Sequence, residues 1–190
     1  MAQYTLPPIS SLASLSTDER AEVLSHLFEP CDALNTLVVS QLGSTTFTTY
    51  SDLISHVQNE LLRLKGSSSS SDTEWLLKIL SAHPRLGAKK VDSAHSRNEQ
   101  ASLGGPTEAA ELERLNNEYE ERFPGMRFVV FVAGRSRQAI MNDMETRIAR
   151  GDIEAEKLEA INVSSSSSLL ALSYIYLHSI IFFVCPFSYI

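Results

Sequence analysis

Apolar residues recur every three or four positions through most of the chain up to Asn162, which is the spacing that places them on one face of a helix. Several of these runs begin at a capping residue and end at proline or glycine, as helices commonly do. The first begins with Ser16 and has Glu19 three positions later, which is the spacing of a capping box. The pattern predicts helices over residues 16–28, 32–42, 51–64, 74–82, 108–123, 136–150 and 153–162. Residues 1–162 are therefore predicted to form one mostly α-helical domain.

Two segments inside this domain do not follow the helical pattern. Residues 66–72 are glycine, five serines and aspartate, so they have nothing to bury and are predicted to be a flexible surface insertion between helices. Residues 127–134 have the sequence RFVVFVAG, whose valine and phenylalanine content suits a buried strand and whose length suits either a strand or a helix. Periodicity alone leaves both states open for this second segment.

The composition changes abruptly after Asn162, and residues 163–190 are predicted to be a Ser-rich linker followed by an apolar tail. Leu169 to Ile190 spans 22 residues without Asp, Glu, Lys or Arg, and a helix that crosses a bilayer needs about 20 apolar residues. Three interpretations stay open: a transmembrane anchor, a packed final helix, or a non-native terminus produced by a misread exon boundary. The abrupt switch in composition favours the third.

Charge and cysteine content narrow the class of protein. The chain of 190 residues has a formal net charge of −7 and a pI near 5.2, and this acidic balance argues against nucleic acid as a partner. Cys31 and Cys185 lie far apart in unlike surroundings, as isolated thiols of a reducing compartment do. The first residues lack a basic region followed by an apolar one, so no secretory signal is predicted and synthesis is expected in the cytosol.

The candidate chemistry lies between His83 and Gln100. His83 precedes Pro84 at the predicted end of a helix, and imidazole is the side chain whose ordinary pKa lies nearest neutrality. Ser96 and Glu99 have the spacing of a capping box, so a purely structural role for Ser96 has about even odds. A helix start also offers backbone amides to an anionic ligand, and Gln100 adds a side-chain amide.

The remaining histidines do not suggest a metal site. None has an acidic or cysteine partner at the spacing of metal ligands; they are His26, His56, His95 and His178. The residues alone therefore predict a helical domain with one acid–base pair, His83 and Glu99, and no metal.

Four motifs in order extend this interpretation: HPRLG at 83–87, SRNEQASLG at 96–104, LNNEYEERFPGMRFVVFVAGRS at 115–136 and METRIARGDIEAE at 144–156. Together they resemble the OHCU decarboxylases, carboxy-lyases that convert 2-oxo-4-hydroxy-4-carboxy-5-ureidoimidazoline to (S)-allantoin in urate degradation without a cofactor. The resemblance implies an all-α homodimer of about seven to eight helices in the cytoplasm or the peroxisome. The chain ends Ser188-Tyr189-Ile190, however, and not in a peroxisomal signal.

The resemblance also implies a role for each matching residue. His83 would be the catalytic acid and Glu99 its catalytic partner on the substrate hydroxyl. The main chain of residues 128–132 would form a wall of the substrate site and, in the family, lies in a helix. The substrate-binding residues implied in this way are Pro84, Ser96, Arg97, Asn98, Gln100, Phe128, Val129, Val130, Phe131 and Val132.

The chain departs from the family at its C-terminal end. Family members carry an arginine in their final helix that contacts the substrate carboxylate, whereas this chain has no Lys or Arg after Lys157. Because guanidinium is a natural bidentate partner of carboxylate, its loss is expected to weaken binding. Two hypotheses follow: an active decarboxylase, or a catalytically impaired helical module tethered to a membrane through Leu169 to Ile190.

Overall fold

The computed structural model describes residues 4–87, 106–132 and 134–183, and every regular element in these ranges is a helix. The elements are a short 3-10 helix η1 (Ile9–Ser14) and the α-helices α1 (Thr17–Leu27), α2 (Asp32–Ser44), α3 (Tyr50–Gly66), α4 (Ser70–Leu80), α6 (Pro106–Arg122), α7 (Arg137–Arg150) and α8 (Ile153–Phe183). The predicted all-α class is therefore confirmed for the described part of the chain.

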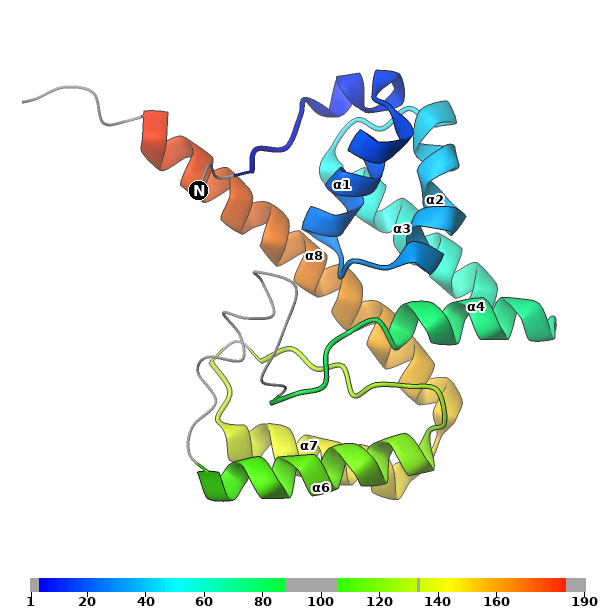
Figure 1. Cartoon of the computed structure of the whole chain (residues 1–190), viewed down its shortest axis with the longest axis vertical. Coiled ribbons are helices and arrows are strands. Elements are labelled where there is room, and N and C mark those ends of the chain that lie inside the picture. The colour runs from blue at the N-terminus through cyan, green and yellow to red at the C-terminus, as the bar shows by residue number, and fades with distance from the viewer. Residues whose placement is uncertain (1–3, 88–105, 133, 184–190) are drawn as a thin grey trace, which may run out of the picture.

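The long helix α8 links two groups of helices (Figure 1). Helix α3 packs most extensively along α8, and α1 and α4 also contact it, so the N-terminal helices are gathered on one stretch of α8. Helices α6 and α7 pack side by side next to the N-terminal end of α8. One helix thus carries both the N-terminal group and the α6–α7 pair.

Side-chain hydrogen bonds fix the starts of several helices. At α1 the Ser16 hydroxyl accepts from the Glu19 amide, and the Glu19 carboxylate accepts from the Ser16 amide, which confirms the predicted capping box. Thr49 and Asp52 form the same reciprocal pair at α3, with N···O distances of 3.1 and 2.8 Å. These contacts satisfy amide groups that the helix itself leaves without a partner.

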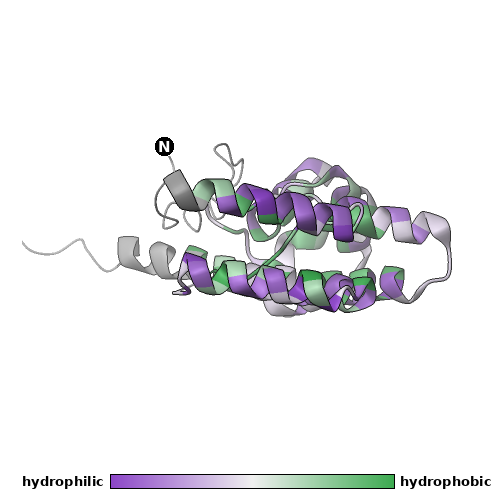
Figure 2. Cartoon of the chain, turned by 90° about the horizontal axis from the view of Figure 1, so that it is seen from below, coloured by the Kyte–Doolittle hydropathy of each residue, from purple (hydrophilic) through white to green (hydrophobic). Residues whose placement is uncertain are grey.

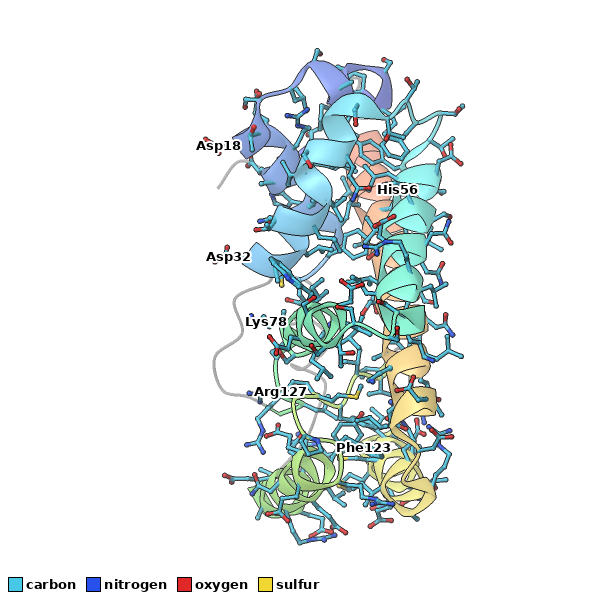
Figure 3. All side chains as sticks on the ribbon, turned by 90° about the vertical axis from the view of Figure 1, so that its right-hand side faces the viewer. Asp18, Asp32, His56, Lys78, Phe123 and Arg127 are labelled. Carbon is cyan, nitrogen blue, oxygen red and sulfur yellow. The ribbon has the colours of Figure 1, made fainter. Side chains whose placement is uncertain are left out.

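The apolar faces of the helices form one continuous core. Figure 2 shows hydrophobic and hydrophilic residues alternating along the same helices, as amphipathic helices require. The largest fully buried side chains come from both helix groups: Tyr119, Phe123, Leu12, Leu24, Leu42, Leu53, Ile54, Leu61, Leu76, Leu80, Leu112 and Leu115. Figure 3 shows Phe123 pointing inward at the level of α6 and α7.

The Ser-rich insertion predicted over 66–72 is shorter than expected. Helix α3 extends through Gly66 and α4 already begins at Ser70, so only residues 67–69 connect them. Asp72 lies in the first turn of α4, where a negative charge is stabilised by the helix dipole. The prediction of a flexible loop across all seven residues was wrong because serine and aspartate also favour helix starts.

The linker predicted at the beginning of 163–190 is also wrong. Helix α8 continues without a break through the five serines and ends at Phe183. Ser164, Ser165 and Ser168 are buried, and each hydroxyl donates to the carbonyl four residues earlier in the helix. A serine that bonds its own helix in this way needs no other polar partner, so a polar run can lie inside a packed helix.

Residues 127–132 are neither the helix implied by the resemblance nor a strand. The chain leaves α6 at Phe123, and Gly125 then adopts a φ of +82°, a conformation that turns the chain and favours glycine. The following segment is irregular, although Phe128, Val129 and Val132 are buried. Its apolar side chains therefore join the core without regular backbone pairing.

The apolar tail divides into two parts. Residues up to Phe183 continue α8, whereas residues 184–190 lie outside the described ranges. No helix in the described part of the chain combines the length and the apolar character that a membrane crossing requires.

The cap of α3 gives a direct test of the fold. Replacing the capping hydroxyl in Thr49→Ala should lower the free energy of unfolding by about 1 kcal/mol, because the Asp52 amide then loses its acceptor. Urea denaturation followed by circular dichroism measures the change. Thr48→Ala, at the exposed neighbouring position outside the helix, is the matched control and should change stability little; equal losses in the two variants would contradict the role of the cap.

Candidate active site

His83 lies at the exit of α4, where the chain turns toward Pro84. Helix α4 ends at Leu80, and a turn over residues 81–83 carries the histidine back toward α8. The Nε2 atom of His83 lies 2.8 Å from the hydroxyl of Ser164 in α8. The predicted acid–base histidine is therefore held against the long helix and does not point freely into solvent.

The bonds of Ser164 determine which nitrogen of the His83 ring carries the proton. The Ser164 hydroxyl donates its single hydrogen to the carbonyl of Ala160 at 2.9 Å. It therefore accepts the bond from His83, so Nε2 carries a hydrogen in the neutral ring. Nδ1 is then the nitrogen that gains and loses the second proton.

The surroundings of His83 favour the neutral ring. Burial lowers the pKa of His83 below its ordinary value, because a charged imidazolium loses its hydration. The negative charge of Glu29, just beyond the end of α1, acts in the opposite direction and raises that pKa. Sequence reasoning missed Glu29, since nothing in its local pattern shows that α1 ends close to a residue 54 positions later.

The turn after His83 is anchored on α6. The Arg85 guanidinium binds the Glu120 carboxylate at 2.8 Å, and the buried amide of Asn116 donates to the carbonyl of Leu86 at 3.0 Å. Gly87 has a φ of +82°, and a Cβ atom there would lie 2.8 Å from the side chain of Leu112. The HPRLG motif thus forms a turn that fits closely onto one helix.

The same helix also holds the predicted wall segment. Arg127, at the start of residues 127–132, binds the Glu120 carboxylate at 3.1 Å. The Oε1 atom of Glu120 therefore joins the turn that carries His83 and Pro84 to the segment that carries Phe128 and its neighbours. Figure 3 places Arg127 at the edge of the molecule and Phe123 in its interior.

The other predicted site residues cannot be located in the same way. Ser96, Arg97, Asn98, Glu99 and Gln100 lie outside the described residues, so their roles stay predictions. Within the described residues, no group of three or more His, Cys, Asp or Glu side chains is placed to hold a metal ion. Cys31 is a free thiol, and Cys185 lies outside the described ranges.

A buried ionic cluster lies beside the wall segment, and sequence reasoning missed it. Arg147 of α7 binds Glu156 of α8 through Nη2 at 2.6 Å, and the Tyr119 hydroxyl of α6 donates to the same carboxylate at 2.7 Å. Arg147 also donates through Nη1 to the carbonyl of Val129 at 3.1 Å. We call Arg147, Glu156 and Tyr119 the buried triad.

The charge state of the buried triad follows from its hydrogen bonds. Burial by itself would raise the pKa of Glu156, but the bonds from Arg147 and Tyr119 outweigh burial and lower that pKa. Burial and the bond to Glu156 together raise the pKa of Tyr119. Glu156 is therefore an anion, Arg147 a cation and Tyr119 a neutral donor at ordinary pH.

The fold and the site together define a class: a helical domain in which a half-buried histidine is fixed between the exit of α4 and the long helix α8. The family model of OHCU decarboxylase matches residues 13–164. This match covers most of the chain and includes His83 and the buried triad. The chain belongs to the OHCU decarboxylase family.

Two known proteins illustrate the relationship. The chain is 36% identical over 90 residues to the uric acid degradation bifunctional protein PucL of Bacillus subtilis (strain 168), an alignment that covers 45% of this chain and 18% of PucL. A crystal structure of (S)-allantoin synthase superimposes with a TM-score of 0.56 and 21% identity over 88% of this chain and 54% of that one. The chain thus spans only part of the length of either protein, and the structural match shows the shared fold.

The protonation of His83 gives a prediction for this site. The ring should titrate with a pKa below the ordinary histidine value of about 6.5, because burial disfavours its charged form. Glu29→Gln removes the charge that raises this pKa, so the midpoint should fall further. Ring-proton chemical shifts followed by NMR from roughly pH 4 to 8 measure both midpoints.

Glu22→Gln is the matched control. Glu22 lies in α1, the helix that ends just before Glu29, and its charge raises the pKa of His26. It should shift the His26 midpoint downward and leave that of His83 in place. A wild-type His83 midpoint at or above about 6.5 would contradict the description of this site.

Proposed function

We propose that the chain catalyses the cofactor-free decarboxylation of 2-oxo-4-hydroxy-4-carboxy-5-ureidoimidazoline to (S)-allantoin in urate degradation. The observation that carries this proposal is the family match over residues 13–164, supported by a half-buried His83 whose ring is held by Ser164. The Bacillus relative, a uric acid degradation protein by name, supports the same pathway. The homodimer and the location in cytoplasm or peroxisome belong to this proposal as well.

The reaction needs one bond to break and one proton to be delivered. The bond between the carboxylate carbon and the ring carbon breaks, carbon dioxide leaves, and the electron pair passes into the conjugated ring. The pair forms a double bond to the neighbouring ring carbon, which bears the ureido group, and the ring nitrogen next to it takes up a proton. A proton then adds to this ureido-bearing carbon from one face while the hydroxyl loses its proton and becomes the ring carbonyl, which gives a single enantiomer. Because the ring itself accepts the electron pair, the site has only to orient the substrate, stabilise negative charge and supply the proton.

His83 is suited to the proton delivery because of how its ring is held. Ser164 fixes the orientation of the ring through Nε2, so Nδ1 is the position that exchanges protons. The substrate is an anion, and a nearby negative charge raises the pKa of an imidazole. Substrate binding would therefore oppose the effect of burial on the pKa of His83 and favour the protonated, acidic form.

The remaining roles follow from the matching motifs. Glu99 would hold the substrate hydroxyl and bias the protonation of His83, while Ser96 and Gln100 would bind the ring. Backbone groups of residues 128–132 would form one wall of the site. A helix start at Ser96 would add amides that stabilise the developing negative charge.

One observation favours the second candidate, a catalytically impaired module of the same fold. The side chain of α8 that meets His83 is the neutral Ser164, and the sequence has no Lys or Arg after Lys157. The carboxylate would then bind without the bidentate arginine of the family. Weak binding with a high KM is the expected signature of this loss.

His83→Asn tests the proposal directly. The variant should form (S)-allantoin at least about 100-fold more slowly, since a positioned acid or base contributes roughly that factor or more. The assay oxidises urate in the presence of the protein and follows the optical activity of the allantoin that forms. Only an active enzyme speeds the formation of one enantiomer.

His56→Asn is the matched control, because His56 bonds Gln41 in the N-terminal helix group and has no part in the proposed site. It should retain wild-type turnover, and both variants should keep their helical circular dichroism. Normal turnover by His83→Asn would sink the assignment of the acid. A folded wild type that produces no optical activity would instead favour the impaired module.

A further inference from the structure

The carbonyl of Val129 has a partner that comes from a distant part of the chain. Residues 127–132 form no regular element, so this carbonyl is not part of the backbone hydrogen-bond pattern of a helix or a sheet. Arg147 supplies one from α7 at 3.1 Å, and its guanidinium also lies over the ring of Phe128, 4.6 Å from the centroid. Two consecutive residues of the wall segment are therefore held by one side chain.

Arg147 is itself fixed by the other two members of the buried triad. Its guanidinium binds Glu156 through Nε and Nη2, at 2.9 and 2.6 Å from Oε2. Tyr119 donates to the same carboxylate and places its ring edge-on to Phe128, with centroids 5.3 Å apart. The side chains of Arg147 and Glu156 are 4% and 0% exposed, so water competes little for these bonds.

We propose that Arg147, oriented by Glu156 and Tyr119, is a positioning residue that sets the main chain of residues 128–132 as a wall of the substrate site. This inference rests on the proposed function, because that function makes the main chain of these residues a contact surface for the substrate. A segment without regular structure needs outside contacts to hold its carbonyls in one place. The buried triad supplies such contacts at Phe128 and Val129.

The geometry requires arginine at this position and not only a positive charge. One planar guanidinium directs Nη2 and Nε to Glu156 and Nη1 to Val129, and its face lies on Phe128. A lysine ammonium is a single point with a more flexible stem, so it cannot reproduce the same three contacts. A lysine at position 147 would therefore keep the positive charge but lose the combined contacts with Glu156, Val129 and Phe128.

The experiment compares Arg147→Lys, Tyr119→Phe and Arg150→Gln with the wild type. Arg147→Lys should lower kcat by about 100-fold, since displacement of a bound substrate by about 1 Å costs that much. The change in KM should be smaller. Amide hydrogen exchange should become faster in residues 128–132 and stay unchanged in α1–α3. Tyr119→Phe keeps the ring on Phe128 and should give a smaller loss in the same direction.

Arg150→Gln is the matched control. Arg150 binds the same Glu156 carboxylate from the same helix but is 40% exposed, and its guanidinium also binds Glu159 of α8. It should leave kcat and the exchange of residues 128–132 at wild-type values. A similar loss in this variant would mean that any weakening of the Glu156 contacts is enough, which would overturn the specific role of Arg147.

Two further outcomes would overturn the inference. If Arg147→Lys keeps kcat within twofold of the wild type, or if its exchange accelerates equally in α1–α3, Arg147 contributes only to general stability. If the wild type itself forms no (S)-allantoin, the proposed function fails together with the catalytic part of this inference. The first result leaves wild-type turnover intact and the second does not, so the two failures are distinguishable.

Discussion

The carboxylate of Glu156 is buried at the beginning of α8, and a buried charge is stable only with a close partner of opposite charge and satisfied hydrogen bonds. Arg147 and Tyr119 provide both, and they come from α7 and α6. Removing one partner of such a pair typically costs about 3–5 kcal/mol, because the remaining charge stays buried. The arrangement of α6, α7 and the start of α8 therefore depends on this contact.

Two sets of contacts connect the buried triad and α6 to the candidate site. Arg147 binds the carbonyl of Val129. Glu120 on α6 binds both Arg127 and Arg85, and Arg85 lies in the turn after His83. Helix α6 is thus the common support of both site segments. Helix α8 contributes twice, since Glu156 fixes the support at one end and Ser164, two turns further along the helix, meets His83. His83 and residues 127–132 are therefore both positioned by contacts with α6 and α8.

The sequence predicted the features that depend on local pattern. Periodic apolar positions gave the helices, and the capping box at Ser16 gave a helix start that the structure confirms. The serines after Asn162 were misinterpreted, because composition does not show that their hydroxyls bond carbonyls of their own helix. The buried triad was also beyond local pattern: Arg147 and Glu156 are nine residues apart across the turn at Gly151, and charged residues at helix ends are usually solvated.

The protonation state of His83 matters more in this chain because the sequence lacks the arginine that the family resemblance places next to the substrate carboxylate. In the site that the family resemblance implies, a terminal arginine would give the substrate carboxylate a permanent positive charge. This chain has no Lys or Arg after Lys157, and its α8 presents Ser164 to His83. A positive charge next to the substrate carboxylate would then have to come from the protonated ring of His83 or from another part of the chain. Arg97 is the basic residue that the family resemblance assigns to substrate binding. Burial lowers the pKa of His83, so a proton taken up by its ring has to be stabilised by Glu29 and by the bound anion. Substrate binding and protonation of the acid would consequently be linked, and binding would weaken as the pH rises.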